Sequence, residues 1–275
     1  MKMSLLSRLH TYGAYYIGGA VLLLLGAPLY QLLVLLPQGY TSTVGHDQSG
    51  PYVWIGHHVL QFLGYRVLLL LAFMLLFSLP FTLFRIIVVQ ELFGLEEELE
   101  GEEQAQQEEK TEEGSKTDAG ELPADAWRGQ GCAVIAAWVG ALGIVCTLLG
   151  ILASSIYLAI VETQGTVVGG WSVLFAIVIN TVGGGLLALS CLSFGFVIAR
   201  RGRNLWPGVW VVFGYAAIAL ALLFSASAVD VATHADAAGA QGVTVFSPTF
   251  PAIIVFALWA LWFGVMLVRL RPAEP

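Results

Sequence analysis

Apolar residues run along this chain in six long stretches that are separated by shorter polar segments. The stretches cover residues 12–36, 66–87, 132–158, 176–199, 206–228 and 249–268. Each reaches the length of about 20 residues that an α-helix needs to cross the hydrocarbon core of a bilayer. Pro80 predicts a kink or the inner end of the second helix, because proline has no backbone N–H to donate. The pattern predicts an all-α, multi-pass transmembrane helical bundle.

The composition agrees with this fold class. Charged residues make up 11% of the chain, hydrophobic residues make up 57%, and the mean hydropathy is +0.80. A soluble domain carries about 25% charged residues. Residues 91–125 hold 14 of the 19 acidic residues, so the net charge of −7 describes one segment and not the membrane body.

That acidic segment separates the second and third stretches. Its centre, Glu96 to Lys116, reads EEELEGEEQAQQEEKTEEGSK. Such a composition buries too little apolar surface to offset its ordering entropy, so we predict a disordered linker over 91–130. It is either a solvated spacer or a docking tail for a basic partner. The candidate docking residues are Glu97, Glu98, Glu102, Glu103, Glu108 and Glu109.

The distribution of lysine and arginine predicts the orientation. Eleven of the twelve precede the first stretch, lie at the inner end of the second or between the second and third, or follow the fourth and sixth. Only Arg66, at the outer edge of the second stretch, departs from this pattern. Because cytoplasmic loops are enriched in lysine and arginine, we expect both termini and the acidic linker to be cytoplasmic.

The two sides of the linker resemble each other when the sequence is shifted by 119 residues. Gly50 then falls on Gly169, Tyr52 on Trp171, and Gly64 on Gly183. The pattern indicates a parallel internal repeat, in which 50–64 and 169–184 form amphipathic helices at the outer interface. We therefore divide the chain into a first membrane half (1–90), the linker (91–130), a second membrane half (131–203) and a C-terminal hairpin of two spans (204–275).

Two segments resemble the N-terminal four-span membrane domain of the FtsK/SpoIIIE DNA translocases. They are GPYVWIGHHVLQFLGYRVLLLLAFMLL (50–76) and VGGWSVLFAIVINTVGGGLLALSCLSFG (168–195). The resemblance implies anchoring and assembly in a bacterial inner membrane. Two further spans stand where that family has its motor, and the phosphate-binding GxxxxGK[ST] loop is absent from the sequence. ATP hydrolysis, DNA translocation and direct nucleic-acid binding are therefore not expected.

Histidine and aspartate on the predicted outer side are candidates for a metal site, because imidazole and carboxylate are common metal ligands. The candidate ligands are His46, Asp47, His57, His58 and His234. Adjacent residues on a helix point about 100° apart, so His57 and His58 would rarely share one ion. The alternative is a polar face of an interfacial helix. No stretch has a central histidine that could ligate haem, so no cofactor is expected. The remaining possibility is a haem or quinone site at the outer edge of the membrane.

Glycines inside the stretches are candidates for close helix packing. We single out Gly140, Gly143, Gly183, Gly184 and Gly185, of which the last three could instead form an oligomer interface. The nearby polar residues Asn180, Thr181 and Ser190 are expected to make hydrogen bonds between helices.

Three functions remain open. The first is a non-enzymatic anchor or scaffold, whose partners are the lipid bilayer, other membrane proteins or a second copy, and a basic cytoplasmic protein at the linker. The second is a transporter or channel component for a small or apolar substrate. No stretch has a central ionisable residue, which argues against ion coupling. The third is a redox or metal-binding subunit. No sequence arrangement typical of a hydrolase is present.

Overall fold

The structure is a computed structural model that describes residues 2–40, 57–89, 125–164, 171–201, 208–233 and 249–269. These residues are almost entirely helical and contain no strand. Six helical segments among them are long and apolar enough to cross a membrane. The predicted all-α, multi-pass bundle is therefore confirmed.

The spans are built from helices of unequal length. The first joins α1 (Lys2–Val21), the π-helical turn η1 (Leu22–Gly26), α2 (Ala27–Tyr30), a second π-helical turn η2 (Gln31–Leu35) and the 3-10 turn η3 (Leu36–Gln38). The second consists of α4 (Val59–Leu76) and a further helix over 79–89. The others lie in α6 (Asp125–Gln164), α7 (Trp171–Arg201), α8 (Gly208–Thr233) and α10 (Thr249–Arg269).

Proline and glycine shape the first span. Pro28 has no N–H for the carbonyl of Leu24, so the regular helical pattern is interrupted and η1 forms just before it. Gly39 ends the span with a φ of 88°, a left-handed conformation that favours glycine. The chain thus leaves the helix directly after Gln38.

The second span is broken near its middle. The N–H of Phe77 bonds to the carbonyl of Met74 at 3.2 Å, Phe77 and Ser78 form a turn, and the helix resumes over 79–89. Pro80 cannot donate to the carbonyl of Leu76. The break therefore lies where Pro80 predicted a kink.

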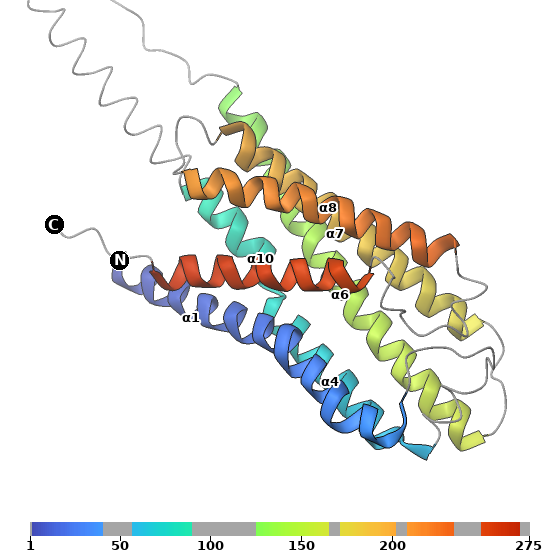
Figure 1. Cartoon of the computed structure of the whole chain (residues 1–275). Coiled ribbons are helices and arrows are strands. Elements are labelled where there is room, and N and C mark those ends of the chain that lie inside the picture. Colours follow the sequence, from blue (N-terminus) through green and yellow to red (C-terminus); the bar gives the residue numbers. More distant parts are fainter. Residues whose placement is uncertain are drawn as a thin grey trace, which may run out of the picture.

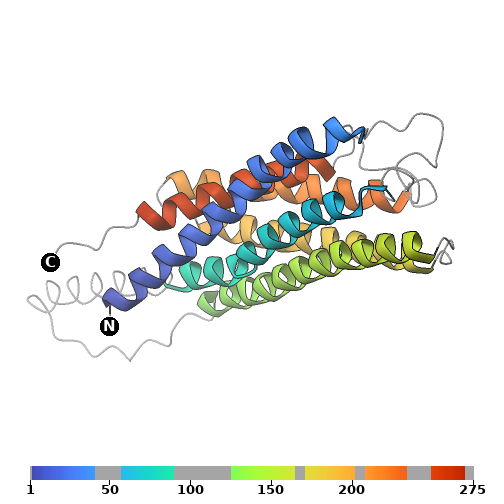
Figure 2. The ribbon, with the colours of Figure 1, turned by 90° about the horizontal axis from the view of Figure 1, so that it is seen from below.

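The helices form a closed ring in the order α1, α4, α6, α7, α8 and α10, because each packs against the next and α10 also packs against α1 (Figure 1). They alternate in direction (Figure 2). We call the end that contains the start of α1 and the end of α10 the terminal end, and the opposite end the loop end. The helix over 79–89 ends, and α6 begins, at the terminal end, so both flanks of the acidic linker lie there (Figure 2).

The predicted C-terminal hairpin does not pack as a separate unit. α8 and α10 belong to the predicted C-terminal hairpin, yet α8 packs most extensively on α7, and α10 packs most extensively on α1. Their buried side chains belong to one core cluster that draws on all six spans. The 204–275 hairpin is therefore part of a continuous core.

Aromatic rings join α10 to three of its neighbours in that core. Phe213 of α8 stacks on Trp259 at a centroid distance of 4.7 Å, and the Trp259 Nε1–H donates to the Phe213 carbonyl at 3.3 Å. Tyr16 of α1 stacks on Phe263 at 5.8 Å. Phe73 of α4 stacks on the third α10 ring, Phe256, at 6.3 Å. These contacts hold α10 between α1, α4 and α8.

The predicted interfacial helices differ from the structure. The described parts of 50–64 and 169–184 are the first turns of α4 and α7, and both helices continue through their glycines without a turn. A Cβ on Gly64 would meet the Tyr30 hydroxyl at 2.5 Å, and one on Gly183 would meet the Cβ of Cys146 at 3.2 Å. These glycines allow close helix contact, whereas the sequence suggested that they end a helix. The last residues of the predicted linker, 125–130, are also helical and begin α6.

Candidate functional site

A cluster of polar side chains lies at the break in the second span. Three hydroxyl groups meet there. Tyr16 is fully buried, and its hydroxyl lies 3.0 Å from Ser78 Oγ and 2.6 Å from Thr82 Oγ1. Thr82 Oγ1 in turn donates to the Ser78 carbonyl at 3.1 Å.

The direction of each hydrogen bond follows from counting protons. The single proton of the Thr82 hydroxyl goes to the Ser78 carbonyl, so Thr82 Oγ1 accepts from Tyr16. The Tyr16 proton is then used, so Ser78 Oγ donates to the Tyr16 oxygen. All three hydroxyls are satisfied, and the carbonyl of Ser78 gains an additional donor at the break. This arrangement fixes α1 against the broken helix.

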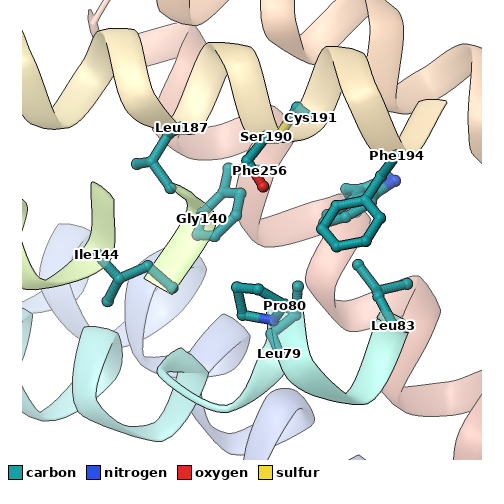
Figure 3. A pocket seen from close by; sticks show the side chains of 11 residues that line it. Leu79, Pro80, Leu83, Gly140, Ile144, Leu187, Ser190, Cys191, Phe194 and Phe256 are labelled. Atoms are coloured by element: carbon teal, nitrogen blue, oxygen red, sulfur yellow. The ribbon is translucent and has the colours of Figure 1, made fainter. Parts of the chain in front are cut away.

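A small void lies beside the break. Pro80 faces Gly140 of α6 and Ser190 of α7 across it, and Phe194 and Phe256 close it (Figure 3). Its volume is about 10 Å³, roughly the room that one water molecule needs. The Ser190 hydroxyl donates to the Ala136 carbonyl at 2.8 Å, so its proton is already used. In this conformation the void has no room for an organic ligand.

Three of the glycines predicted to pack helices lie where α6 meets its neighbours. A Cβ on Gly140 would collide with Ser190 Oγ and approach the Pro80 ring to 3.1 Å. A Cβ on Gly143 would lie 3.0 Å from the Leu187 backbone nitrogen, and Gly183 lies at the same α6–α7 contact. Any side chain at these positions would force α6 away from α7 or from the second span.

The other two predicted glycines have more room. A Cβ on Gly184 would make ordinary contact with Ala228 of α8 at 3.6 Å. Gly185 is exposed, and a Cβ there would meet nothing within 4 Å. Gly185 therefore faces outward from the bundle.

Two close approaches between helix backbones involve glycines that the sequence analysis did not single out. A Cβ on Gly13 of α1 would lie 2.9 Å from the Gly264 carbonyl oxygen of α10, and a Cβ on Gly264 would lie 2.8 Å from the Gly13 oxygen. Gly195 and Gly214 make a similar contact between α7 and α8, at 2.7 Å to the Gly214 oxygen. Nothing in a single sequence indicates which of 31 glycines face each other in this way.

The polar residues of α7 behave differently from one another. Ser190 makes the expected hydrogen bond to α6. Thr181 does not, because its Oγ1 is buried and has no hydrogen-bond partner. The Asn180 side chain lies directly over Gly150 of α6, where a Cβ would collide with its Oδ1. Only Ser190 thus fulfils the prediction with a defined bond.

The structure describes two of the predicted metal ligands. His57 is exposed, and His58 is half-buried at the N-cap of α4. His46, Asp47 and His234 lie outside the described residues, as do Glu97, Glu98, Glu102, Glu103, Glu108 and Glu109. Within the described residues, no three His, Cys, Asp or Glu side chains come together as metal ligands would. The metal site stays a prediction.

Comparisons with known proteins found no related protein. No protein-family model, curated protein or solved structure matches the chain. The resemblance to the membrane domain of the FtsK/SpoIIIE translocases therefore stays a prediction that rests on the residues quoted above.

Proposed function

We propose that this integral membrane protein is a non-enzymatic anchor or scaffold subunit of a larger membrane complex. The observation that supports the proposal is the close packing of the described core around its small central void. Sites for small molecules are commonly cavities of about 300–1,000 Å³. A rigid bundle of this kind is suited to holding segments in place rather than to passing a substrate.

In this proposal the protein resides in a bacterial inner membrane, with both termini and the acidic segment in the cytoplasm. The six candidate docking residues, Glu97, Glu98, Glu102, Glu103, Glu108 and Glu109, offer a negative surface to a basic partner. Anionic lipid headgroups repel such a segment, so it stands away from the membrane, where a cytoplasmic protein can reach it.

The test is co-purification of the full chain, carrying a C-terminal tag, from native membranes in mild detergent. We expect a constant set of partner proteins in stoichiometric amounts. Deleting 96–121 should remove the cytoplasmic members of the set. A variant with the six glutamates changed to glutamine keeps the length of the segment, and it should lose the same members, because the attraction is electrostatic and screened by salt. A chain that elutes alone or as a pure homo-oligomer contradicts the scaffold proposal.

A transporter or channel component is the second candidate, because one specific observation favours it. Discontinuous helices near the bilayer midplane often form the binding sites of transporters, and the second span is broken near its middle beside Tyr16. Flux of small apolar solutes into proteoliposomes separates the two candidates. A transporter should keep its flux when 96–121 is deleted and lose it when Gly183 is enlarged to leucine.

A further inference from the structure

Arg66 is the one cation on the predicted outer side, and the structure gives it an unusual setting. It lies on α4 toward the loop end and is half-buried. Its guanidinium carbon stands 4.9 Å from the centre of the Phe62 ring, one helical turn earlier. Phe62 is itself buried and contacts the rings of Tyr40 and Tyr65 at centroid distances of 6.5 Å and 6.4 Å.

This setting covers one face of the guanidinium but leaves a buried in-plane donor, the Nε–H, without an acceptor. A cation–π contact engages the face of the group, whereas its five N–H bonds point outward in the plane. The Arg66 Nε is buried and has no hydrogen-bond partner. A buried donor on a charged group without an acceptor is strongly unfavourable, so an anionic acceptor at this position would stabilise Arg66.

The depth of Arg66 in the span indicates where that anion comes from. The second span covers Val59–Val89, and a hydrocarbon core centred on it takes about 20 residues, from about 64 to about 84. Arg66 then lies about 3 Å inside the boundary at 1.5 Å per residue. Long cationic side chains reach from this depth to the headgroup level, where the phosphates of lipids lie.

The neighbouring tyrosines complete a site for a phosphate group. Tyr40 and Tyr65 both contact the Phe62 ring over which the guanidinium lies, and tyrosine is enriched at headgroup level. Burial raises the pKa of Tyr40, and the guanidinium partly offsets that rise, so its hydroxyl keeps its proton and can donate. The planar fork of arginine matches two oxygens of one phosphate.

We propose that Arg66, on its platform of Phe62 and flanked by Tyr40 and Tyr65, binds the phosphate of one phospholipid in the leaflet at the loop end. The protein would then hold a structural lipid between the end of the first span and the start of the second. The proposal is independent of the scaffold function, because it predicts lipid binding whether or not partner proteins are found.

The test is native mass spectrometry of the delipidated full chain in detergent, titrated with dioleoylphosphatidylglycerol. Arg66→Gln should weaken binding of the first lipid by at least about tenfold, the equivalent of one charge-assisted hydrogen bond. Arg66→Lys keeps the charge without the fork and should weaken binding less. Arg85→Gln is the matched control, because Arg85 is an exposed arginine near the other end of the same span, and it should leave binding unchanged.

Two probes identify the ligand. Dioleoylglycerol has the same chains without the phosphate, and it should bind wild type and Arg66→Gln equally. Excess inorganic phosphate should not displace the bound lipid. Displacement would show that the site binds free phosphate, and it would overturn the proposal that a phospholipid occupies the site. Equal lipid binding by wild type and Arg66→Gln would overturn the proposal altogether. If Arg66→Gln fails to fold, Arg66→Lys provides the test. Lipid binding by Arg66→Lys that equals binding by wild type would then overturn the proposal that the guanidinium binds two oxygens of one phosphate.

Discussion

At the scale of single residues, the described core accommodates polar groups by satisfying them locally. The Tyr16 hydroxyl, Ser78 and Thr82 exchange hydrogen bonds around the break in the second span. In lipid, water does not replace a lost partner, so a buried hydroxyl must find one inside the protein. At the kink, the Thr82 hydroxyl adds a second donor to the Ser78 carbonyl, and the Tyr16 hydroxyl links this group to α1.

Tyr16→Phe tests this role. We expect a loss of about 1 kcal/mol in the free energy of unfolding, the typical size of a hydrogen bond between helices in a membrane. The loss is modest because the Thr82 hydroxyl retains the Ser78 carbonyl as its acceptor. Unfolding in detergent by a chemical denaturant measures it. Tyr15→Phe is the control, since Tyr15 is 48% exposed and should change stability by less than about 0.5 kcal/mol.

Gly140 tests the junction of α6, α7 and the second span. Gly140→Ala places a Cβ against Ser190 Oγ and the Pro80 ring, and we expect a loss of about 1–3 kcal/mol from overpacking. Ser190→Ala removes one of the two clashes. The double variant should therefore be more stable than the sum of the single effects predicts. Strict additivity in denaturant unfolding would show that Gly140 and Ser190 are not in contact.

At the scale of helices, close approach of backbones decides which helices are neighbours. α1 and α10 come from opposite ends of the chain, yet Gly13 and Gly264 let them touch through their carbonyl oxygens. Without a hydrophobic force between helices in lipid, such contacts supply much of the association energy. This pair closes the ring of helices.

Gly264→Ala should open that contact. Its Cβ would lie 2.8 Å from the Gly13 oxygen, and backbone atoms at that distance must move apart, so we expect a loss of about 1–3 kcal/mol in unfolding free energy. Gly185→Ala is the matched control, because its Cβ meets nothing within 4 Å. Equal stability of the two variants would contradict the α1–α10 contact. If Gly185→Ala changes the oligomeric state and Gly264→Ala does not, the exposed surface around Gly185 contacts a second copy of the chain.

At the scale of the whole molecule, the alternating helices set a topology that experiment can read. Helix direction places the start of α1, the flanks of the acidic linker and the end of α10 at one end of the bundle. Among the described residues, Arg8, Arg85, Arg128, Arg201 and Arg269 lie in the helix segments at this end, whereas Arg66 lies toward the other. The positive-inside rule then predicts that this end is cytoplasmic.

Reporter fusions test the orientation. A reporter that is active only in the cytoplasm should work at position 118 and at the C-terminus, and one that requires export should work at positions 47 and 236. The reverse pattern would contradict the predicted orientation, although it would leave the helix packing untouched.

The sequence by itself was sufficient for the fold class and the number of spans. A bilayer offers no water to backbone groups, so each span must be a helix about 20 residues long, and apolar runs of that length mark it directly. Pro80 marked the break for an equally local reason. Both inferences need only neighbouring residues in the chain.

Helix partners and contact points were decided by the tertiary structure alone. The sequence repeat places the ends of interfacial helices at Gly64 and Gly184, whereas α4 and α7 continue through both positions, and Gly64 and Gly183 lie against Tyr30 and Cys146. The α1–α10 contact joins positions 13 and 264. Glycine has the same local signature at a turn, at a close contact and on an open surface. Its role depends on the side chains that distant segments bring to it, and only the folded chain specifies those.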